Sequence, residues 1–331
     1  MTDIRTLLAD APDVSVTCLP DGSVDRRYEV EDAAGHVESR TALGERIASG
    51  RAKSFLVDHE TTEPGGQAVN AARQAHALGA DTTLYGHLDH AVFDALECET
   101  HSMGRPADVA VLEFTDDAVM FTEESPDVDA WTLDALRAVE ADLSRPFGAD
   151  AVAWLNWAST DHGTAALREF TRVDVPDAGW LVLDPGDVTV REPSAVPGLL
   201  DALATVERAV AVSVNDEELA FLADAIGAPA GRAARLDAVR ERSNADVVVL
   251  HGEDEAVAAT PDGVVRRPNP RVEAVRYTGA GDRFSAALAY ALAADWPLTA
   301  ALALGNAAAT YYVAHAESGD PAALADWAAE R

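Results

Sequence analysis

Lysine is almost absent from this chain of 331 residues, and cysteine is rare. Of the 25 basic residues only Lys53 is a lysine, and the other 24 are arginines. The two cysteines, Cys18 and Cys98, are too few for a disulfide framework or a zinc site, so we expect small buried side chains there. No uncharged apolar run reaches the length of a membrane span, and residues 1–12 lack the apolar core of a signal peptide. We therefore expect a cytoplasmic protein that does not bind membranes.

Positive charge is also scarce, because 57 acidic residues outnumber the basic ones and give a formal net charge of −32. Such a surface repels the phosphates of nucleic acids, so we expect no nucleic-acid partner. A hydrophobic content of 48% is too high for a disordered acidic tail and indicates a globular chain. Salt screens the self-repulsion of so acidic a surface, so the composition is typical of a halophilic protein.

Strand and helix patterns alternate along most of the chain, and a helix from Gly66 to Gly79 is the first strong one. Buried strands are predicted at residues 14–19, 82–85, 151–155, 180–183, 209–214 and 247–250. Further helices are predicted around residues 90–99, 132–143, 161–171, 216–226 and 232–242. This alternation predicts an α/β fold with a Rossmann-like, doubly wound and mostly parallel sheet.

Two segments interrupt this rhythm with strands of their own. Residues 24–30 alternate between apolar and polar side chains, and residues 32–62 contain strand-like pieces without a helical face. Residues 109–114 and 118–121 flank Asp116-Asp117 as a hairpin. We therefore expect one domain over residues 14–331, with a small β-sheet lid inserted at about 24–62 and about 109–122. A second hairpin is predicted at residues 256–263.

The most informative stretch is Thr278-Gly279-Ala280-Gly281-Asp282, which precedes an alanine-rich helical pattern. Glycine lets the backbone approach a ligand closely, and the free N–H groups of a first helical turn favour an anion. A carboxylate beside a bound phosphate would be repelled unless it had a chemical role, such as taking a proton from an attacking hydroxyl group. The stretch therefore indicates phosphoryl transfer with Asp282 as the base. The alternative is a helix cap with Asp282 in the favourable first turn.

Other motifs stand in a defined order around this stretch. They are Gly65, Gly66 and Asn70 at a helix start, Asn215 and Glu218 three positions apart, Gly252 after a buried strand, and Asn306. Together they resemble the ribokinase-like, or PfkB, family of carbohydrate kinases over about residues 14–319. The resemblance implies transfer of the γ-phosphate of ATP, with Mg²⁺, to a sugar hydroxyl group under a closing lid. It leaves open whether ATP or ADP is the donor.

The resemblance also implies a role for each matched position. Asp282 is the expected base, and the N–H groups of Gly279, Ala280 and Gly281 are the expected anion hole. The sugar is expected at Asp25, Gly65, Gly66 and Asn70. Magnesium and the nucleotide are expected at Glu218, Asn215, Gly252 and Asn306. Taken alone, Gly65 and Gly66 could be an ordinary helix entry, and Asn215 with Glu218 an ordinary capping box.

Two departures from the family pattern concern cations. The family often has aspartate and threonine before the glycine turn, with the aspartate near a monovalent cation, and here Arg276 and Tyr277 stand there. We expect this guanidinium to replace the cation, so that activity does not depend specifically on potassium. In addition, Lys53, Arg51 and Arg283 would suit a substrate that carries a phosphate or a carboxylate.

The sequence therefore favours ribose 1-phosphate as the substrate and leaves other acceptors open. The alternatives are ribose, fructose, 2-keto-3-deoxygluconate or a nucleoside, or a sugar-binding regulator without catalysis. Exposed strand edges of the lid also make a homodimer through the lid an expectation by analogy with the family.

Overall fold

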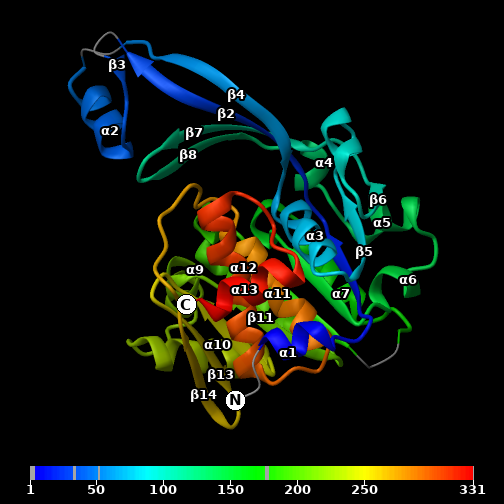
Figure 1. Cartoon of the computed structure of the whole chain (residues 1–331). Coiled ribbons are helices and arrows are strands. Elements are labelled where there is room, and N and C mark those ends of the chain that lie inside the picture. Colours follow the sequence, from blue (N-terminus) through cyan, green and yellow to red (C-terminus); the bar gives the residue numbers. More distant parts are fainter. Residues whose placement is uncertain (1–3, 33–34, 51–52, 176–178, 331) are drawn as a thin grey trace.

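The computed structural model describes residues 4–32, 35–50, 53–175 and 179–330. Within these residues a nine-stranded sheet forms the centre of the molecule, in the order β14-β13-β12-β11-β10-β9-β1-β5-β6 (Figure 1). Its strands are β1 (Ser15–Leu19), β5 (Asp81–Gly86), β6 (Glu99–Ser102), β9 (Ala151–Leu155), β10 (Trp180–Asp184), β11 (Ala209–Val214), β12 (Val247–His251), β13 (Glu255–Thr260) and β14 (Gly263–Pro268). All neighbouring strands from β6 at one edge across to β12 pair in parallel. The pairs β12–β13 and β13–β14 are antiparallel. The predicted doubly wound, mostly parallel sheet is confirmed.

Helices cover both faces of this sheet and create two hydrophobic cores. One core lies under α1 (Ile4–Ala9), α3 (Gln67–Ala77), α11 (Ala280–Ala293), α12 (Leu298–His315) and α13 (Pro321–Ala329). The other lies under α5 (Leu133–Val139), α7 (Gly163–Phe170), α8 (Val196–Leu203), α9 (Asp216–Ala225) and α10 (Arg232–Ser243). Successive side chains of a strand point to opposite faces, so Ala153 joins the first core and Trp154 the second.

Cys18 is buried and Cys98 is half-buried, and both are free thiols.

The strand order reverses direction at β1, and this reversal positions the site. From β1 the chain adds β5 and β6 on one side, and β9 to β12 on the other. In open α/β sheets the crevice for a ligand lies outside the carboxyl ends of the strands at such a reversal. Polar side chains at the carboxyl ends of β1, β9, β10 and β11 are therefore positioned to line such a crevice.

A second sheet, the lid sheet, projects from one end of the main sheet, with β3 and α2 at its far tip (Figure 1). It consists of β2 (Ser23–Asp32), β3 (Gly35–His36), β4 (Leu56–Gly65), β7 (Ala107–Phe114) and β8 (Asp117–Glu123). Strand β2 pairs antiparallel with β4 and parallel with β7, so the lid sheet is mixed. Val30, Val37 and Leu43 form a small core of its own at the tip.

Two local predictions are wrong. Residues 32–62 contain a helix, α2 (Arg40–Ala48), which the sequence hides because only Leu43 of this helix is buried. The helix expected around residues 90–99 is a short 3₁₀ turn, η1 (Ala91–Ala95), followed by the edge strand β6. The remaining short helices are α4 (Pro126–Asp129), α6 (Ser144–Phe147), η2 (Trp157–Ser159), η3 (Val188–Val190) and η4 (Pro193–Ala195). Among the described helices, none is long and apolar enough to span a bilayer.

Candidate active site

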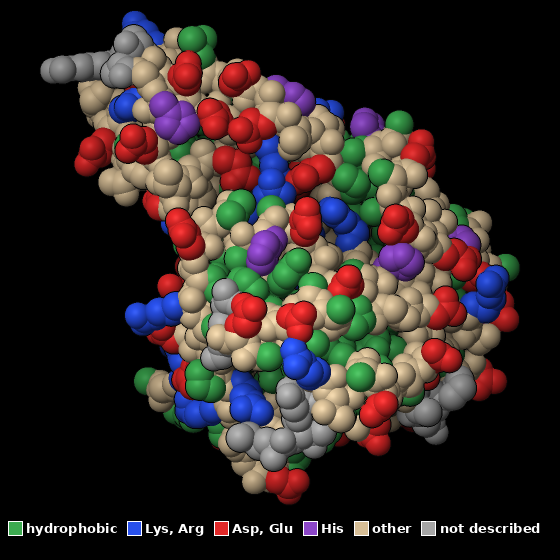
Figure 2. Space-filling model, in the orientation of Figure 1, with side chains coloured by type: hydrophobic (Ala, Val, Ile, Leu, Met, Phe, Trp, Pro, Cys, Tyr) green, Lys and Arg blue, Asp and Glu red, His purple; other side chains and the backbone are tan. Residues whose placement is uncertain are grey.

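A cleft of about 920 Å³ opens at the carboxyl ends of the parallel strands, on the side of the lid sheet. Its walls include residues that follow β1, β9, β10 and β11, the first turns of α3 and α11, and parts of β7 and β8. Figure 2 shows the lid overhanging the body of the molecule, with acidic side chains spread over both. The predicted base, the sugar-binding turn and the Asn215–Glu218 pair all contribute to this one cleft.

Asp282 lies in the first turn of α11 and is held by two amide side chains. The Asn70 Nδ2 group donates to one carboxylate oxygen at 2.7 Å, and the Gln67 Nε2 group donates to the other at 3.1 Å. Gln67 and Asn70 are three positions apart and therefore share one face of α3. The side chain of Asp282 is only 7% exposed. Both of its oxygens are thus oriented before any ligand binds.

The turn of residues 278–282, which we call the α11 turn, is held by a hydrogen bond from the side chain of Arg283. Arg283 Nη1 donates to the Gly279 carbonyl at 2.9 Å, and its guanidinium lies 3.9 Å from the ring centre of Tyr312. Gly279 has φ 94°, and a Cβ there would lie 2.5 Å from Arg283 Nη1. Glycine is therefore required by both conformation and space.

This geometry corrects the expectation that Arg283 binds a substrate anion, because its side chain is 1% exposed and does not line the cleft. Of the three N–H groups expected to form an anion hole, that of Ala280 already donates to the Tyr277 carbonyl at 3.1 Å. Gly279 and Gly281 line the cleft. The N–H groups of these two glycines therefore remain the candidates for binding an anion.

The other glycine pair, Gly65 and Gly66, allows close packing against the start of β2. A Cβ on Gly65 would lie 2.2 Å from the Asp25 carboxyl group, and a Cβ on Gly66 would lie 2.7 Å from Gly22 Cα. Gly66 also has φ 98°. Asp25 accepts a hydrogen bond of 2.6 Å from Ser23, and burial raises its pKa. The glycines thus bring Asp25 to the wall of the cleft.

Asp21 is a site residue that the sequence reasoning missed. It follows β1 and accepts hydrogen bonds from the N–H groups of Gln67 and Ala68 at 3.0 and 2.7 Å, so it caps α3 from another element. It also accepts from Asn156 Nδ2 at 2.8 Å, after β9. Burial raises the pKa of Asp21, and these hydrogen bonds oppose the rise. The available signal was its position two residues after a buried strand.

Asp184, the last residue of β10, was also missed by the sequence reasoning. It accepts hydrogen bonds from Ser285 Oγ at 2.8 Å and from Gln67 Nε2 at 3.3 Å. Gln67 therefore bridges Asp184 and Asp282. Burial, and next the charge of Asp282, raises the pKa of Asp184 to about 7.

Asn215 and Glu218 form a capping box at the start of α9 and also line the cleft. Asn215 accepts from the Glu218 N–H at 2.9 Å, and Glu218 accepts from the Asn215 N–H and Nδ2 at 2.9 and 2.7 Å. Burial, and next the charge of Asp184, raises the pKa of Glu218 well above its usual range. The capping-box interpretation of this pair is therefore confirmed, and its role toward magnesium and the nucleotide stays a prediction.

The donor set suits magnesium only together with a ligand's phosphates. Among the described residues, no three histidine, cysteine or carboxylate side chains converge as a metal site. Magnesium commonly binds through one or two carboxylates, waters and substrate phosphates. Glu218 and Asp184, which both line the cleft, supply carboxylates of this kind.

Of the residues expected at the nucleotide, Asn215 lines the cleft, whereas Gly252 and Asn306 do not. His251, at the end of β12, was not among the expected residues but lines the cleft, and burial lowers its pKa to about 4. The neighbouring Gly252 donates its N–H to the Glu255 carbonyl at 3.1 Å and is not among the lining residues. Asn306 donates to the carbonyls of Arg267 and Pro268 at 3.3 and 3.1 Å, so it fixes the end of β14 instead of facing the cleft.

Lys53 is too far along the lid to reach this cleft. It is exposed and precedes Leu56, whereas Asp25 pairs with Glu63, seven positions further along β4. At about 3.3 Å per residue this separation is already roughly 20 Å. The proposed partner Arg51 lies outside the described residues.

The charged side chains that line the cleft are almost all acidic. Among its described lining residues nine are carboxylates: Asp21, Asp25, Glu124, Asp129, Asp161, Asp184, Asp187, Glu218 and Asp282. Arg191 is the one arginine or lysine among them, and it pairs with Asp161 at 2.7 Å. The cleft thus has no free cation for a substrate phosphate in the part that the structure describes.

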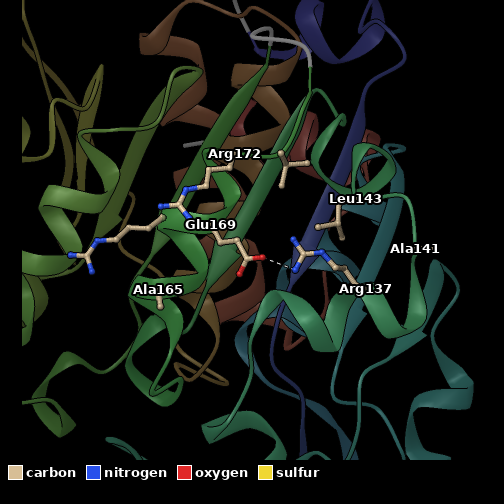
Figure 3. Close-up of a pocket in the computed structure, with 8 residues that line it drawn as sticks. Arg137, Ala141, Leu143, Ala165, Glu169 and Arg172 are labelled. Carbon is tan, nitrogen blue, oxygen red and sulfur yellow. Dashed lines mark ion pairs between the residues drawn. The ribbon is translucent and has the colours of Figure 1, made fainter.

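A second cavity, of about 620 Å³, lies beside α5 and α7 (Figure 3). Figure 3 shows Arg137 and Glu169 pointing toward each other, and Arg137 also pairs with Asp134 at 2.9 Å. None of the residues lining this cavity belongs to the motifs described above. The cleft beside the lid sheet is therefore the one that gathers the predicted site residues.

Comparisons with known proteins agree with this geometry. A family model described as prokaryotic ketohexokinase matches residues 21–329. The ketohexokinase of Haloferax volcanii is 27% identical over 322 residues, which cover 88% of this chain and 85% of that protein.

Solved structures share the fold at low identity. Phosphofructokinase-2 from Escherichia coli in complex with potassium superposes with a TM-score of 0.69 at 14% identity, over 96% of this chain and 98% of that one. Ribokinase from Arabidopsis thaliana complexed with ribose and ATP gives a TM-score of 0.66 at 17% identity, over 96% and 99%.

Proposed function

Because the chain belongs to the prokaryotic ketohexokinase family, among the PfkB or ribokinase-like carbohydrate kinases, we propose that it phosphorylates a neutral ketohexose, with fructose as the first candidate. An enzyme of this family is a phosphotransferase that acts on an alcohol group and uses ATP. The regulator without catalysis is therefore set aside.

The charge of the cleft is the observation that carries the choice of a neutral sugar. A substrate phosphate would enter a cleft with nine carboxylates, where the guanidinium of Arg191 is already paired with Asp161. The resulting repulsion opposes binding of ribose 1-phosphate. ATP differs, because its phosphates meet the N-terminus of α11 and bring magnesium with them.

In the proposed reaction Asp282 accepts the proton of the attacking sugar hydroxyl group. Asn70 and Gln67 hold its two oxygens, so the base is oriented before the sugar arrives. The N–H groups of Gly279 and Gly281 stabilise the charge that develops on the transferred phosphoryl group. Asp25 and the backbone at Gly65 and Gly66 bind hydroxyl groups of the sugar.

Glu218, with Asn215 beside it, is the proposed residue for ordering magnesium, which would neutralise phosphate charge at this end of the cleft. Asp184 interacts electrostatically with both Glu218 and Asp282. The charge of Asp184 raises the pKa of Glu218, and the charge of Asp282 raises the pKa of Asp184. Gly252 and Asn306 support the nucleotide end only indirectly, through the backbone around β12 and β14.

A homodimer through the lid sheet is the proposed assembly. The lid carries exposed apolar side chains on two of its strands, Leu56 and Val57 of β4 and Met120 and Phe121 of β8. Such side chains on a sheet are typical of an interface. Sedimentation analysis of the wild type and of Phe121→Ser tests this proposal, which predicts a dimer that weakens in the variant; a monomeric wild type would oppose it.

Release of ADP across a panel of acceptors tests the substrate. Fructose, ribose, 2-keto-3-deoxygluconate, a nucleoside and ribose 1-phosphate are compared at high salt with magnesium and ATP. We expect the highest kcat/KM with a neutral ketohexose, and NMR of the product identifies the hydroxyl group that is phosphorylated. Turnover with the sugar phosphate alone would contradict the proposal.

A further inference from the structure

Four charged side chains meet where the lid sheet approaches the α11 turn. They are Arg27 of β2, Glu63 of β4, Glu113 of β7 and Arg276 of the loop before α11. Arg276 lies 3.0 Å from a carboxylate oxygen of Glu63 and 3.8 Å from one of Glu113. Arg27 pairs with the same two glutamates. Three lid strands and the loop are thus joined through one ion cluster.

On the lid side this cluster is adjacent to the proposed sugar site. Glu63 is the cross-strand partner of Asp25, and Arg27 lies two residues after Asp25, on the same face of β2. That face borders the cleft, because Asp25 and Val109 of the neighbouring strand both line it. A displacement of β2 and β4 around a bound sugar would therefore move the cluster as well.

On the body side the cluster is adjacent to the phosphate site. Arg276 precedes Thr278 and Gly279, which line the cleft, by two and three residues. Its own N–H donates to the Val313 carbonyl at 3.0 Å, which anchors the loop to α12. A cavity of about 60 Å³ separates residues 274–278 from the β7–β8 hairpin, so the lid and the loop meet there without close packing.

The cluster is partly buried, so the loss of one ion pair would leave a poorly solvated charge. The side chain of Arg27 is 4% exposed, and those of Glu63, Glu113 and Arg276 are 20 to 26% exposed. Burial raises the pKa of Glu63, but Arg27 and Arg276 outweigh it and hold this pKa below its usual range. An ion pair that is partly buried is costly to break by removing one partner. The lid and the α11 turn therefore favour one relative position.

We propose that Arg276 is a positioning residue that couples sugar binding under the lid to phosphate binding at the α11 turn. This inference rests on the proposed function. Sugar at Asp25 holds the lid strands in place, the two glutamates hold the guanidinium, and Arg276 holds the turn that donates to the phosphates. Coupling of this kind is reciprocal, so the sugar strengthens nucleotide binding and the nucleotide strengthens sugar binding by the same factor.

Binding of the non-hydrolysable ATP analogue AMP-PNP with magnesium, measured by calorimetry with and without saturating fructose, tests the coupling. In the wild type we expect fructose to tighten AMP-PNP binding about fivefold or more. In Arg276→Gln we expect this factor to fall close to one, whatever the change in affinity for AMP-PNP alone. A residue with only a structural role would change binding with and without fructose alike.

Two further variants keep the test independent of folding. Arg26→Gln removes an arginine of β2 that pairs with Asp108 and alternates in orientation with Arg27, so its coupling should match the wild type. Glu113→Gln removes the longer contact of Arg276 and leaves Glu63 in place, so its coupling should be intermediate.

The outcomes separate this inference from the proposed function. Fructose that is phosphorylated but leaves AMP-PNP affinity unchanged in the wild type would overturn the coupling alone. Full coupling in Arg276→Gln would also overturn it. If fructose neither binds nor is phosphorylated, the proposed function fails and the coupling fails with it.

Discussion

The buried carboxyl groups of the cleft differ mainly in the hydrogen-bond donors that surround them. Asp282 receives an amide donor on each oxygen, whereas Asp184 shares one of these donors and rests against Ser285. Hydrogen bonds to a carboxylate favour its charged form, and burial favours its neutral form. For Asp184 burial outweighs these hydrogen bonds and raises its pKa.

Asp184 should make stability depend on pH. In the folded protein its pKa is raised to about 7, against 3.8 for an unperturbed group. Between these values the folded state binds more protons than the unfolded state, so the free energy of unfolding falls as pH rises. Asp184→Asn removes this contribution and should gain at least about 1 kcal/mol relative to the wild type between pH about 4 and about 8.

Urea unfolding of both proteins at the two pH values measures this difference. Both proteins carry all the other carboxylates, so the pH dependence that these contribute cancels in the difference between the two free energies of unfolding. An equal stability difference at both pH values would show that Asp184 is ionised throughout.

At the scale of elements, the start of α11 depends on a backbone conformation that only glycine adopts easily. Gly279→Ala would place a Cβ 2.5 Å from Arg283 Nη1 at φ 94°, so we expect a loss of about 1 to 3 kcal/mol in the free energy of unfolding and a lower kcat. Gly44→Ala is the matched control, because Gly44 lies in α2 with nothing within 4 Å of its Cβ position. That change should be neutral or stabilise by up to about 1 kcal/mol.

Chemical denaturation and initial rates of the two variants provide the comparison. Loss of stability in both variants would point to a general cost of the substitution and not to the α11 turn.

Elements also show what the sequence could predict. The buried strands of the main sheet and the α11 turn were predictable because apolar runs and the glycine turn are local signals, whereas the polar edge strand β6 was not. Asp21 and Asp184 were not, because each acts through a sheet order that brings distant strand ends together. Arg283 was misinterpreted because its sequence position does not reveal that its side chain turns back under Gly279. Helix α2 was missed because one buried leucine gives no amphipathic face.

At the scale of the whole molecule, charge is the dominant property. A net charge of −32 destabilises the compact state through self-repulsion, and salt screens it. We expect the thermal midpoint to rise by about 10 °C or more between about 0.1 M and about 2 M KCl. Differential scanning calorimetry at fixed pH measures the shift, and a midpoint independent of salt would argue against a halophilic protein.

The central claim is that Asp282 acts as the base of a sugar kinase. The most direct measurement is kcat/KM for fructose in the wild type and in Asp282→Asn, which keeps the size of the side chain but cannot accept the proton. The account predicts a loss of about a thousandfold or more with little change in ATP affinity. A variant that retains activity within about tenfold of the wild type would contradict it.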